Sequence, residues 1–232
     1  IRYTNKYKTR NHLQRSIILM GRLKKTKIKD WTGYVVGYEC KKKQIQIVMC
    51  DKHQADSIII KYHYSKKPTK NSFLNMLVIY ENKVSGALQI GYGIRPNKNK
   101  NFKKGEVVEF DRMWLSDNMP KYSETITLSL LNNFLKNRYK NLKAIISYSD
   151  TSVGNNGTIY KAGNYKLIDK HKVDFYITQE GERIHPVTMW HRHKTRAWDF
   201  LKNKYPNIKK ANGYQLKYIY YLKTNERSKI SK

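Results

Sequence analysis

The chain has 232 residues, of which 47 are Lys or Arg and 17 are Asp or Glu, so its formal net charge is +30. An excess of this size attracts polyanions and makes their binding depend strongly on salt, which favours a nucleic acid as partner. The hydrophobic fraction of 39% is enough for a folded core. No apolar run approaches the ~20 residues of a membrane-spanning helix, so we expect no membrane span.

The positive charge is concentrated towards the two ends of the chain. Residues 1–30 hold ten Lys or Arg and one acid, with little apolar periodicity, which predicts a basic N-terminal arm. Residues 31–222 are predicted to form a single domain, and residues 223–232 a basic tail. Cys40 and Cys50 fit neither a disulfide framework nor a zinc motif, so we expect both to be small core residues in a reducing cytoplasm.

The first half of the chain predicts a series of strands. Alternating or short apolar runs bounded by turn residues indicate strands at residues 44–49, 57–61, 75–80, 86–91 and 106–115. The strand 57–61 would place His63 at a strand end, and residues 81–85 would close a hairpin. The segment 101–130 is unusually acidic for this chain, and its acids are expected either to neutralise Arg112 or to serve a site.

The second half predicts helices among further strands. Ser123 is the expected N-cap of an amphipathic helix whose apolar positions fall at helical spacing, namely Ile126, Leu130, Leu131, Phe134 and Leu135. Further strands are predicted at 143–149, 165–170, 173–178 and 215–222, with helices at 157–163 and 197–204. The order predicts an α/β (α+β) domain with a mixed, mostly antiparallel sheet flanked by helices.

The stretch from Ser147 to Tyr165 carries the clearest signal for chemistry. The apolar run 144–146 delivers Asp150 to a strand end, a Gly/Asn loop follows, and Tyr160 lies ten residues after the carboxylate. A strand-end carboxylate beside a glycine loop suits a general base or a metal ligand. The alternative is that Asp150 only caps its turn, which Asp does well.

Four segments together resemble the Mom family of phage DNA-modification proteins. They are His63-Tyr64-Ser65, Phe110-Asp-Arg112-Met-Trp114, Tyr122-Ser123-Glu124, and Ser147-Tyr-Ser-Asp150 with Gly157-Thr-Ile-Tyr160-Lys-Ala162. The strand Lys217-Tyr-Ile-Tyr-Tyr221 is similar to the closing strand of the family. The order and spacing of these segments, over roughly residues 56–222, are more specific than any one of them.

The resemblance implies a fold like that of the GNAT-type N-acetyltransferases and a transferase in the cytoplasm of a bacterial host. Its substrate would be double-stranded DNA, in which a flipped adenine becomes N6-carbamoylmethyl-adenine and protects the phage genome from restriction. The sequence carries no signal for the oligomeric state.

The resemblance also implies roles for individual residues. His63 or Asp150 would be the base, Tyr64 and Tyr160 would donate hydrogen bonds or stack, and Arg112 would clamp an anionic donor. The set expected to bind a cofactor is Arg112, Ser123 and Glu124. The resemblance also suggests iron, which would be held by His63, Tyr64, Asp150 and Tyr160.

One departure from the acetyltransferase pattern concerns the cofactor. Those enzymes carry a glycine-lined turn that holds the pyrophosphate of coenzyme A at a helix N-terminus. The corresponding segment 117–124 contains no glycine, so a coenzyme A-type donor is doubtful.

Two other classes of function remain as alternatives. They are an acyltransferase of the same fold that acts on RNA or protein amines, and a nucleic-acid-binding protein without catalysis.

His191 and His193 are a poor helical ligand pair at i, i+2, so we interpret them as part of the basic surface.

Overall fold

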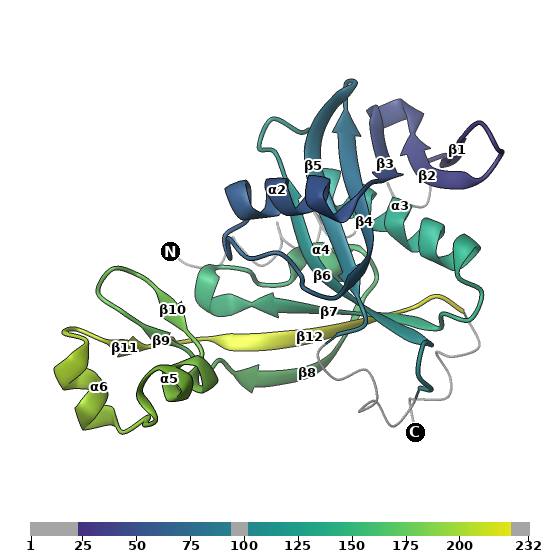
Figure 1. Ribbon diagram of the computed structural model, residues 1–232. Coiled ribbons are helices and arrows are strands. Elements are labelled where there is room, and N and C mark those ends of the chain that lie inside the picture. Colours follow the sequence, from purple (N-terminus) through teal and green to yellow (C-terminus); the bar gives the residue numbers. More distant parts are fainter. Residues whose placement is uncertain (1–22, 94–101, 224–232) are drawn as a thin grey trace, which may run out of the picture. The chain divides into compact units, whose positions relative to one another are not determined.

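Figure 1 shows a computed structural model of the chain, which describes residues 23–93 and 102–223. Most of the predicted tail and most of the predicted N-terminal arm lie outside these residues. The chain divides into two compact units. Unit 2 comprises Ser149–Gly157 and Ile168–Lys217, and unit 1 holds the rest, so the expected domain 31–222 covers both. No helix among the described residues is long and apolar enough to cross a membrane.

A nine-stranded sheet forms the frame of the molecule, in the order β1-β2-β3-β4-β5-β6-β7-β12-β8. Neighbouring strands from β1 to β6 are antiparallel, whereas β6 and β7 are parallel. The prediction of a mixed, mostly antiparallel sheet is therefore confirmed. The strands are β1 (Thr26–Lys29), β2 (Val35–Cys40), β3 (Ile45–Met49), β4 (Ser72–Tyr80), β5 (Lys83–Gly91), β6 (Val107–Leu115), β7 (Ala144–Asp150), β8 (Lys166–Lys172) and β12 (Tyr214–Tyr221).

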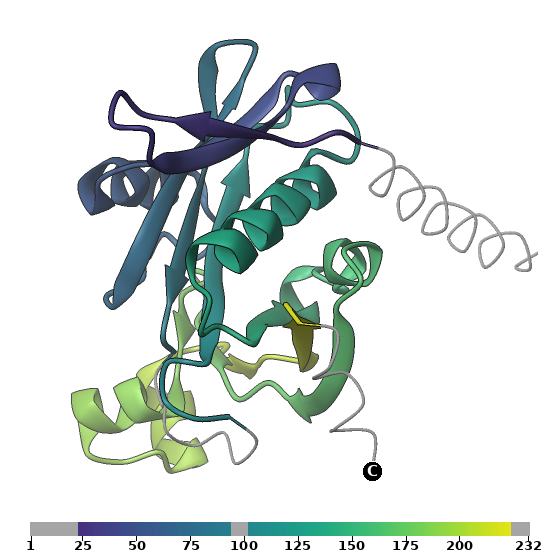
Figure 2. The ribbon, with the colours of Figure 1, turned by 90° about the vertical axis from the view of Figure 1, so that its right-hand side faces the viewer.

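Two helices cover opposite faces of the antiparallel part of the sheet, as Figures 1 and 2 show. Helix α2 (Lys52–Tyr62) packs on β4, β5 and β6, and α3 (Ser123–Arg138) packs on β2 and β3. All five apolar positions that predicted α3 are buried, because the helix lies against the sheet. The short helix α4 (Thr158–Ala162) lies where residues 157–163 were predicted to be helical.

The strand predicted at residues 57–61 is wrong, because this segment lies inside α2. Three consecutive isoleucines favour a strand by local propensity. The helical signals are Gln54, whose side-chain oxygen accepts a hydrogen bond from the Asp51 N–H at 3.1 Å, and the burial of Ala55 and Ile59 at i, i+4. His63 therefore follows a helix, not a strand.

Unit 2 has a core of its own. Its three-stranded sheet has the order β10-β9-β11, with β9 (Tyr176–Ile177), β10 (Arg183–Ile184) and β11 (Lys209–Lys210). Helices α5 (Pro186–His193) and α6 (Trp198–Lys204) complete it. The core consists of Tyr176, Ile184, Met189, Leu201 and Ile208. The strand predicted at 173–178 shrinks to two residues, and α5 was not predicted, whereas α6 matches the helix predicted at 197–204.

Strand β6 contains a bulge that decides which side chains face α2. Phe110 pairs with Ile90 and Arg112 pairs with Gln89, so Asp111 is the extra residue. Because Ile90 and Gln89 are consecutive, they lie on opposite faces of the sheet, and their partners do too. The bulge therefore places Arg112, and Trp114 two residues later, on the face that α2 covers.

The helical assignment of α2 predicts opposite effects for two neighbouring isoleucines. Ile59 is fully buried, so Ile59→Ala should lower the free energy of unfolding by about 2–5 kcal/mol. Ile60 is 49% exposed, so Ile60→Ala should change it by no more than about 0.5 kcal/mol. Urea denaturation measures both variants. A similar loss in both would contradict the burial pattern of α2.

Candidate active site

Four of the predicted site residues gather in unit 1, next to the C-terminal end of α2. The ring centroids of His63 and Tyr64 are 4.3 Å apart. The Arg112 charge is near enough to lower the pKa of His63, and both Tyr64 and Arg112 influence the pKa of Tyr160. We call these four residues the α2-end site. They come from the loop after α2, from β6 and from α4.

His63 is the C-cap of α2 and is fixed by hydrogen bonds. Its backbone N–H donates to the Ile59 carbonyl at 3.0 Å. The backbone N–H of Ser65 donates to His63 Nδ1 at 3.1 Å, and Ser65 Oγ lies 2.8 Å from the same nitrogen. A backbone N–H is always a donor, so Nδ1 must be an acceptor and the neutral ring carries its proton on Nε2.

The environment keeps His63 uncharged at neutral pH. The residue is 6% exposed, and its burial, followed by the positive charges of Arg112 and Lys66, lowers its pKa from 6.5 to about 4. A neutral imidazole that is protonated on Nε2 can donate a hydrogen bond to an oxygen that develops negative charge. This arrangement suits a hydrogen-bond donor better than a general base.

Arg112 supplies the positive charge of the site. Its Nε donates to the Lys67 carbonyl at 3.1 Å, and Nη1 donates to the Asp111 carbonyl at 2.8 Å. Among the described residues no carboxylate lies within ion-pair distance of it. The guanidinium is therefore oriented by backbone oxygens, which leaves its charge available to an anion.

Tyr160 is a buried phenol in an aromatic cluster. Its ring centroid lies 5.3 Å from that of Tyr218 and 5.5 Å from that of Tyr165. Burial raises the pKa of Tyr160 above its ordinary value of 10, although the nearby Ser147 and Arg112 oppose this increase. The phenol therefore stays protonated and can donate a hydrogen bond.

Buried hydroxyl groups surround this phenol. Ser147 and Tyr218 are both fully buried; the Tyr218 hydroxyl has no hydrogen-bond partner within the described part of the chain, whereas the Ser147 hydroxyl is close enough to the Tyr160 phenol to lower its pKa. Ser147 is also the last β7 residue that pairs with β6, opposite Phe110. An unpaired buried hydroxyl is costly, so the Tyr218 hydroxyl marks this cluster as a place where a ligand atom could bind.

Asp150 belongs to unit 2 and is engaged there on both oxygens. Oδ1 accepts a hydrogen bond from the Ser152 N–H at 2.8 Å, which caps the short 3-10 helix η2 (Thr151–Val153). Oδ2 accepts from Arg183 Nη2 at 2.7 Å, and Arg183 Nη1 donates to Ser152 Oγ. Asp150 therefore makes the capping contact that was considered as an alternative to a catalytic role, and it also forms an ion pair that the sequence did not predict.

Ser123 and Glu124 lie at the start of α3. The expectation that Ser123 is the N-cap is wrong by one residue, because the N-cap is Tyr122 and Ser123 is the first helical residue. Ser123 Oγ donates to the Pro120 carbonyl instead. Tyr122 has φ 74°, a left-handed conformation, at a position where the acetyltransferase pattern would supply glycines. Binding of a cofactor by Ser123 and Glu124 stays a prediction.

Asp111 is a residue whose position the sequence did not reveal. It is the extra residue of the β6 bulge, and one of its oxygens, Oδ2, is buried with no hydrogen-bond partner in the described structure. Burial, followed by the nearby Glu109, raises the pKa of Asp111 to about 7. A Cβ at Gly91 would lie 2.6 Å from Oδ2, so the glycine leaves room for the carboxyl. The one available signal was an acid in a strongly basic chain.

The four residues suggested for iron do not present a ready donor set. The Tyr160 phenol stays protonated, both Asp150 oxygens are engaged, and His63 Nδ1 accepts from Ser65. Nowhere in the described ranges do three His, Cys, Asp or Glu side chains come together so that they could hold a metal ion. Iron binding by these four residues stays a prediction.

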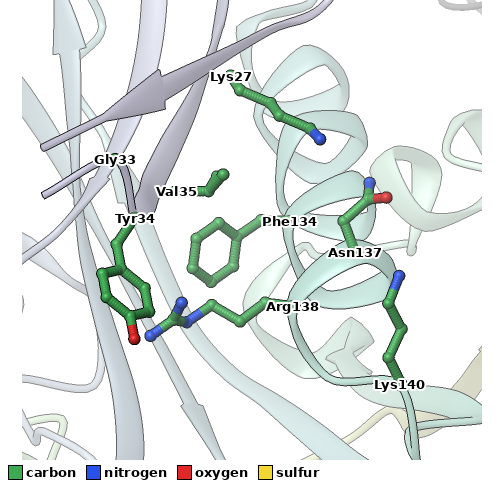
Figure 3. A pocket seen from close by; sticks show the side chains of 8 residues that line it. All are labelled: Lys27, Gly33, Tyr34, Val35, Phe134, Asn137, Arg138 and Lys140. Carbon is green, nitrogen blue, oxygen red and sulfur yellow. The ribbon is translucent and has the colours of Figure 1, made fainter.

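An open pocket lies elsewhere in unit 1, between the β1–β2 hairpin and the C-terminal half of α3 (Figure 3). Its volume is about 370 Å³, and Lys27, Arg138 and Lys140 give it a positive lining. The Arg138 guanidinium lies over the Tyr34 ring, 5.7 Å from its centroid. None of the predicted site residues lines this pocket, so it is separate from the α2-end site.

Comparison with known proteins identifies the family. The model of the Mom protein family matches residues 44–232. A curated relative is methylcarbamoylase mom of Escherichia phage Mu, which is 31% identical over 182 residues and covers 74% of each chain.

Solved structures with similarity to the chain include two acetyltransferases. The ribosomal-protein-S5-alanine acetyltransferase of Vibrio fischeri has a TM-score of 0.47 at 11% identity and covers 82% of this chain and 98% of its own. A GNAT family acetyltransferase of Elizabethkingia anophelis with bound acetyl-CoA has a TM-score of 0.41 at 13% identity, with coverage of 77% and 98%. Similarity at this level carries no argument about activity. The match over residues 44–232, together with the phage Mu relative, shows that the chain belongs to the Mom protein family.

Proposed function

We propose that the chain is a transferase that adds a carbamoylmethyl-type group to N6 of adenine in double-stranded DNA and so protects phage DNA from restriction. The observation that carries the proposal is that three of the family-like segments converge on the α2-end site. His63, Arg112 and Tyr160 come from distant parts of the sequence, and the charge of Arg112 acts on the pKa of both His63 and Tyr160. The phage Mu relative, a methylcarbamoylase, supports the type of group.

Adenine imposes two physical requirements on such an enzyme. The N6 lone pair is delocalised into the ring, so the amine is a poor nucleophile and must be oriented against an electrophilic carbon. The base is also stacked and paired, so it must leave the helix at a cost of a few kcal/mol. The net charge of +30 supplies phosphate contacts that can offset this cost.

The α2-end site offers donors and a positive charge. In our assignment, His63 Nε2–H and the Tyr160 hydroxyl donate hydrogen bonds to oxygens of the adenine or of the group donor. Arg112 holds an anionic part of the donor. As the N6–C bond forms, the leaving group departs with the bonding electrons and N6 loses a proton. Asp150 remains the proposed base, and it would have to exchange its ion pair with Arg183 to act.

Two other functions remain as candidates with different signatures. An acyltransferase that acts on RNA or protein amines would leave deoxyadenosine unchanged and would acylate those amines. A binding protein without catalysis would need no buried donor cluster. The unpaired, buried hydroxyl of Tyr218 beside Tyr160 favours an enzyme over such a protein.

Expression of the chain in a bacterium should add mass to deoxyadenosine and leave the other three nucleosides unchanged. Mass spectrometry of nucleosides from the digested DNA measures this. His63→Ala removes the Nε2–H donor and should abolish the added mass while the protein stays folded. Unmodified deoxyadenosine from a soluble, well-expressed wild-type protein would rule out the proposed reaction.

The neutral state of His63 predicts a dependence of stability on pH. Its pKa is about 4 in the folded protein and 6.5 when unfolded, so between these values the unfolded state binds the proton first. The free energy of unfolding should therefore fall by on the order of 1–3 kcal/mol as the pH drops from 6.5 to 4.

Asp111 acts in the opposite direction over this range, because its pKa is raised, so His63 must be isolated by comparison with a variant. Urea denaturation across this pH range gives the free energy of unfolding of the wild type and of His63→Gln. The difference between the two should change with pH by the amount that is due to His63. A difference that stays constant with pH would show that His63 titrates normally.

Asp150→Asn separates the capping and the catalytic roles of this residue. Asn keeps an oxygen for the Ser152 N–H, so η2 should stay intact, but the charge opposite Arg183 is lost. We expect the variant to fold and bind DNA yet to lose adenine modification. Arg183→Gln, which breaks the same ion pair but leaves the carboxylate, is the matched control and should retain activity. Near-normal modification by Asp150→Asn would remove Asp150 from the catalytic set.

A further inference from the structure

Beside the α2-end site, two aromatic rings form a stacked pair that no step above uses. Tyr62 is the last residue of α2, and Trp114 lies near the end of β6. Their ring centroids are 4.4 Å apart, and the ring planes are inclined by 15°. We propose that this pair is a stacking platform for one unpaired nucleobase of the DNA, next to the position at which adenine is modified.

The indole is held in place by packing. Trp114 lies against the buried cluster of Ala55, Ile59 and Ala87, which joins α2 to β5. The β6 bulge puts it on the same face as Arg112. A platform must be rigid before the base arrives, because ordering a ring on binding would cost free energy. Trp114 meets this condition.

Tyr62 is accessible as well as ordered. It is 45% exposed, although it is a large aromatic residue that stacks on a fixed indole. The Lys61 ammonium lies 5.0 Å from the centroid of the Tyr62 ring. An exposed lysine side chain is flexible, so an incoming base can replace it on the ring, and the ammonium can then move to a phosphate.

The charges around the platform match nucleic acid. Lys61, Lys66 and Lys67 are exposed, and within the described ranges none of them has a carboxylate partner. Lys66 Nζ also donates to the Lys61 carbonyl, which ties the loop after α2 to the end of the helix. Aromatic rings that are interleaved with unpaired cations are the usual surface for unpaired bases and their phosphates.

The platform deepens the proposed function, on which it rests for the choice of DNA. Tyr62 is followed directly by His63, so a base on the platform would lie next to the site residues. The alternative is a purely structural role, in which Tyr62 only shields Trp114 from water. In that case Tyr62→Ala would slightly lower the free energy of unfolding and would leave the affinity for DNA unchanged.

Two probes distinguish these readings. One is a duplex oligonucleotide in which a single adenine faces an abasic site, and the other is the same duplex fully paired. Fluorescence anisotropy measures the dissociation constant for each. Tyr62→Ala should weaken binding of the abasic probe about 10-fold more than binding of the paired probe, since loss of one base–aromatic stack has effects of this order.

Two control variants sharpen the test. Tyr62→Phe keeps the ring and should bind the abasic probe within about 2-fold of the wild type. Tyr34→Ala removes another exposed tyrosine, which also lies beneath a cation, Arg138, and it should leave both dissociation constants unchanged. Equal binding of the abasic probe by Tyr62→Ala and the wild type, or an equal loss on both probes, would overturn the platform. So would a wild type that binds neither probe.

Failure of the platform and failure of the proposed function give different results. Wild-type protein that modifies adenine, combined with a Tyr62→Ala variant that binds both probes normally, would reject the platform and leave the reaction intact. Selective loss of abasic-probe binding by Tyr62→Ala, in a protein that leaves deoxyadenosine unchanged, would support the platform and reject the reaction.

Discussion

The bulge in β6 is the constraint on which both proposals depend. One extra residue, Asp111, turns Arg112 and Trp114 to the face that α2 covers. There Arg112 meets the loop that carries His63, and Trp114 meets Tyr62 at the end of the helix. Without the bulge, Arg112 and Trp114 would share the face of Phe110, away from α2. The bulge also buries an acid in a strongly basic chain, and the absence of a side chain at Gly91 makes room for it.

Burial sets the protonation states of the α2-end site in a consistent way. His63 is held neutral and Tyr160 is held protonated, while Arg112 keeps its charge without a carboxylate partner among the described residues. A site with two neutral donors and one cation is suited to stabilising negative charge on oxygen, not to removing protons. In the proposed reaction the proton of the adenine amine needs a different acceptor, and Asp150 is proposed for that role.

The sequence predicted most of the sheet, because most of its strands are alternating or short apolar runs that are bounded by turn residues. It also predicted α3, whose five apolar positions are all buried. It failed at α2, because three isoleucines favour a strand locally and the helix is decided by Asp51, Gln54 and packing on the sheet.

Of the residues predicted for the site, His63, Tyr64, Arg112 and Tyr160 lie together in the structure, and their roles stay predictions. The bulge at Asp111 and the Tyr62–Trp114 stack were not predicted, because a bulge and a stacked pair depend on register and tertiary packing, which single-sequence patterns do not carry.

The most direct test of this account is the protonation of His63, from the ¹⁵N NMR signals of its ring at pH 7. The account predicts a protonated Nε2 and an unprotonated Nδ1. A proton on Nδ1, or on both nitrogens, would contradict it.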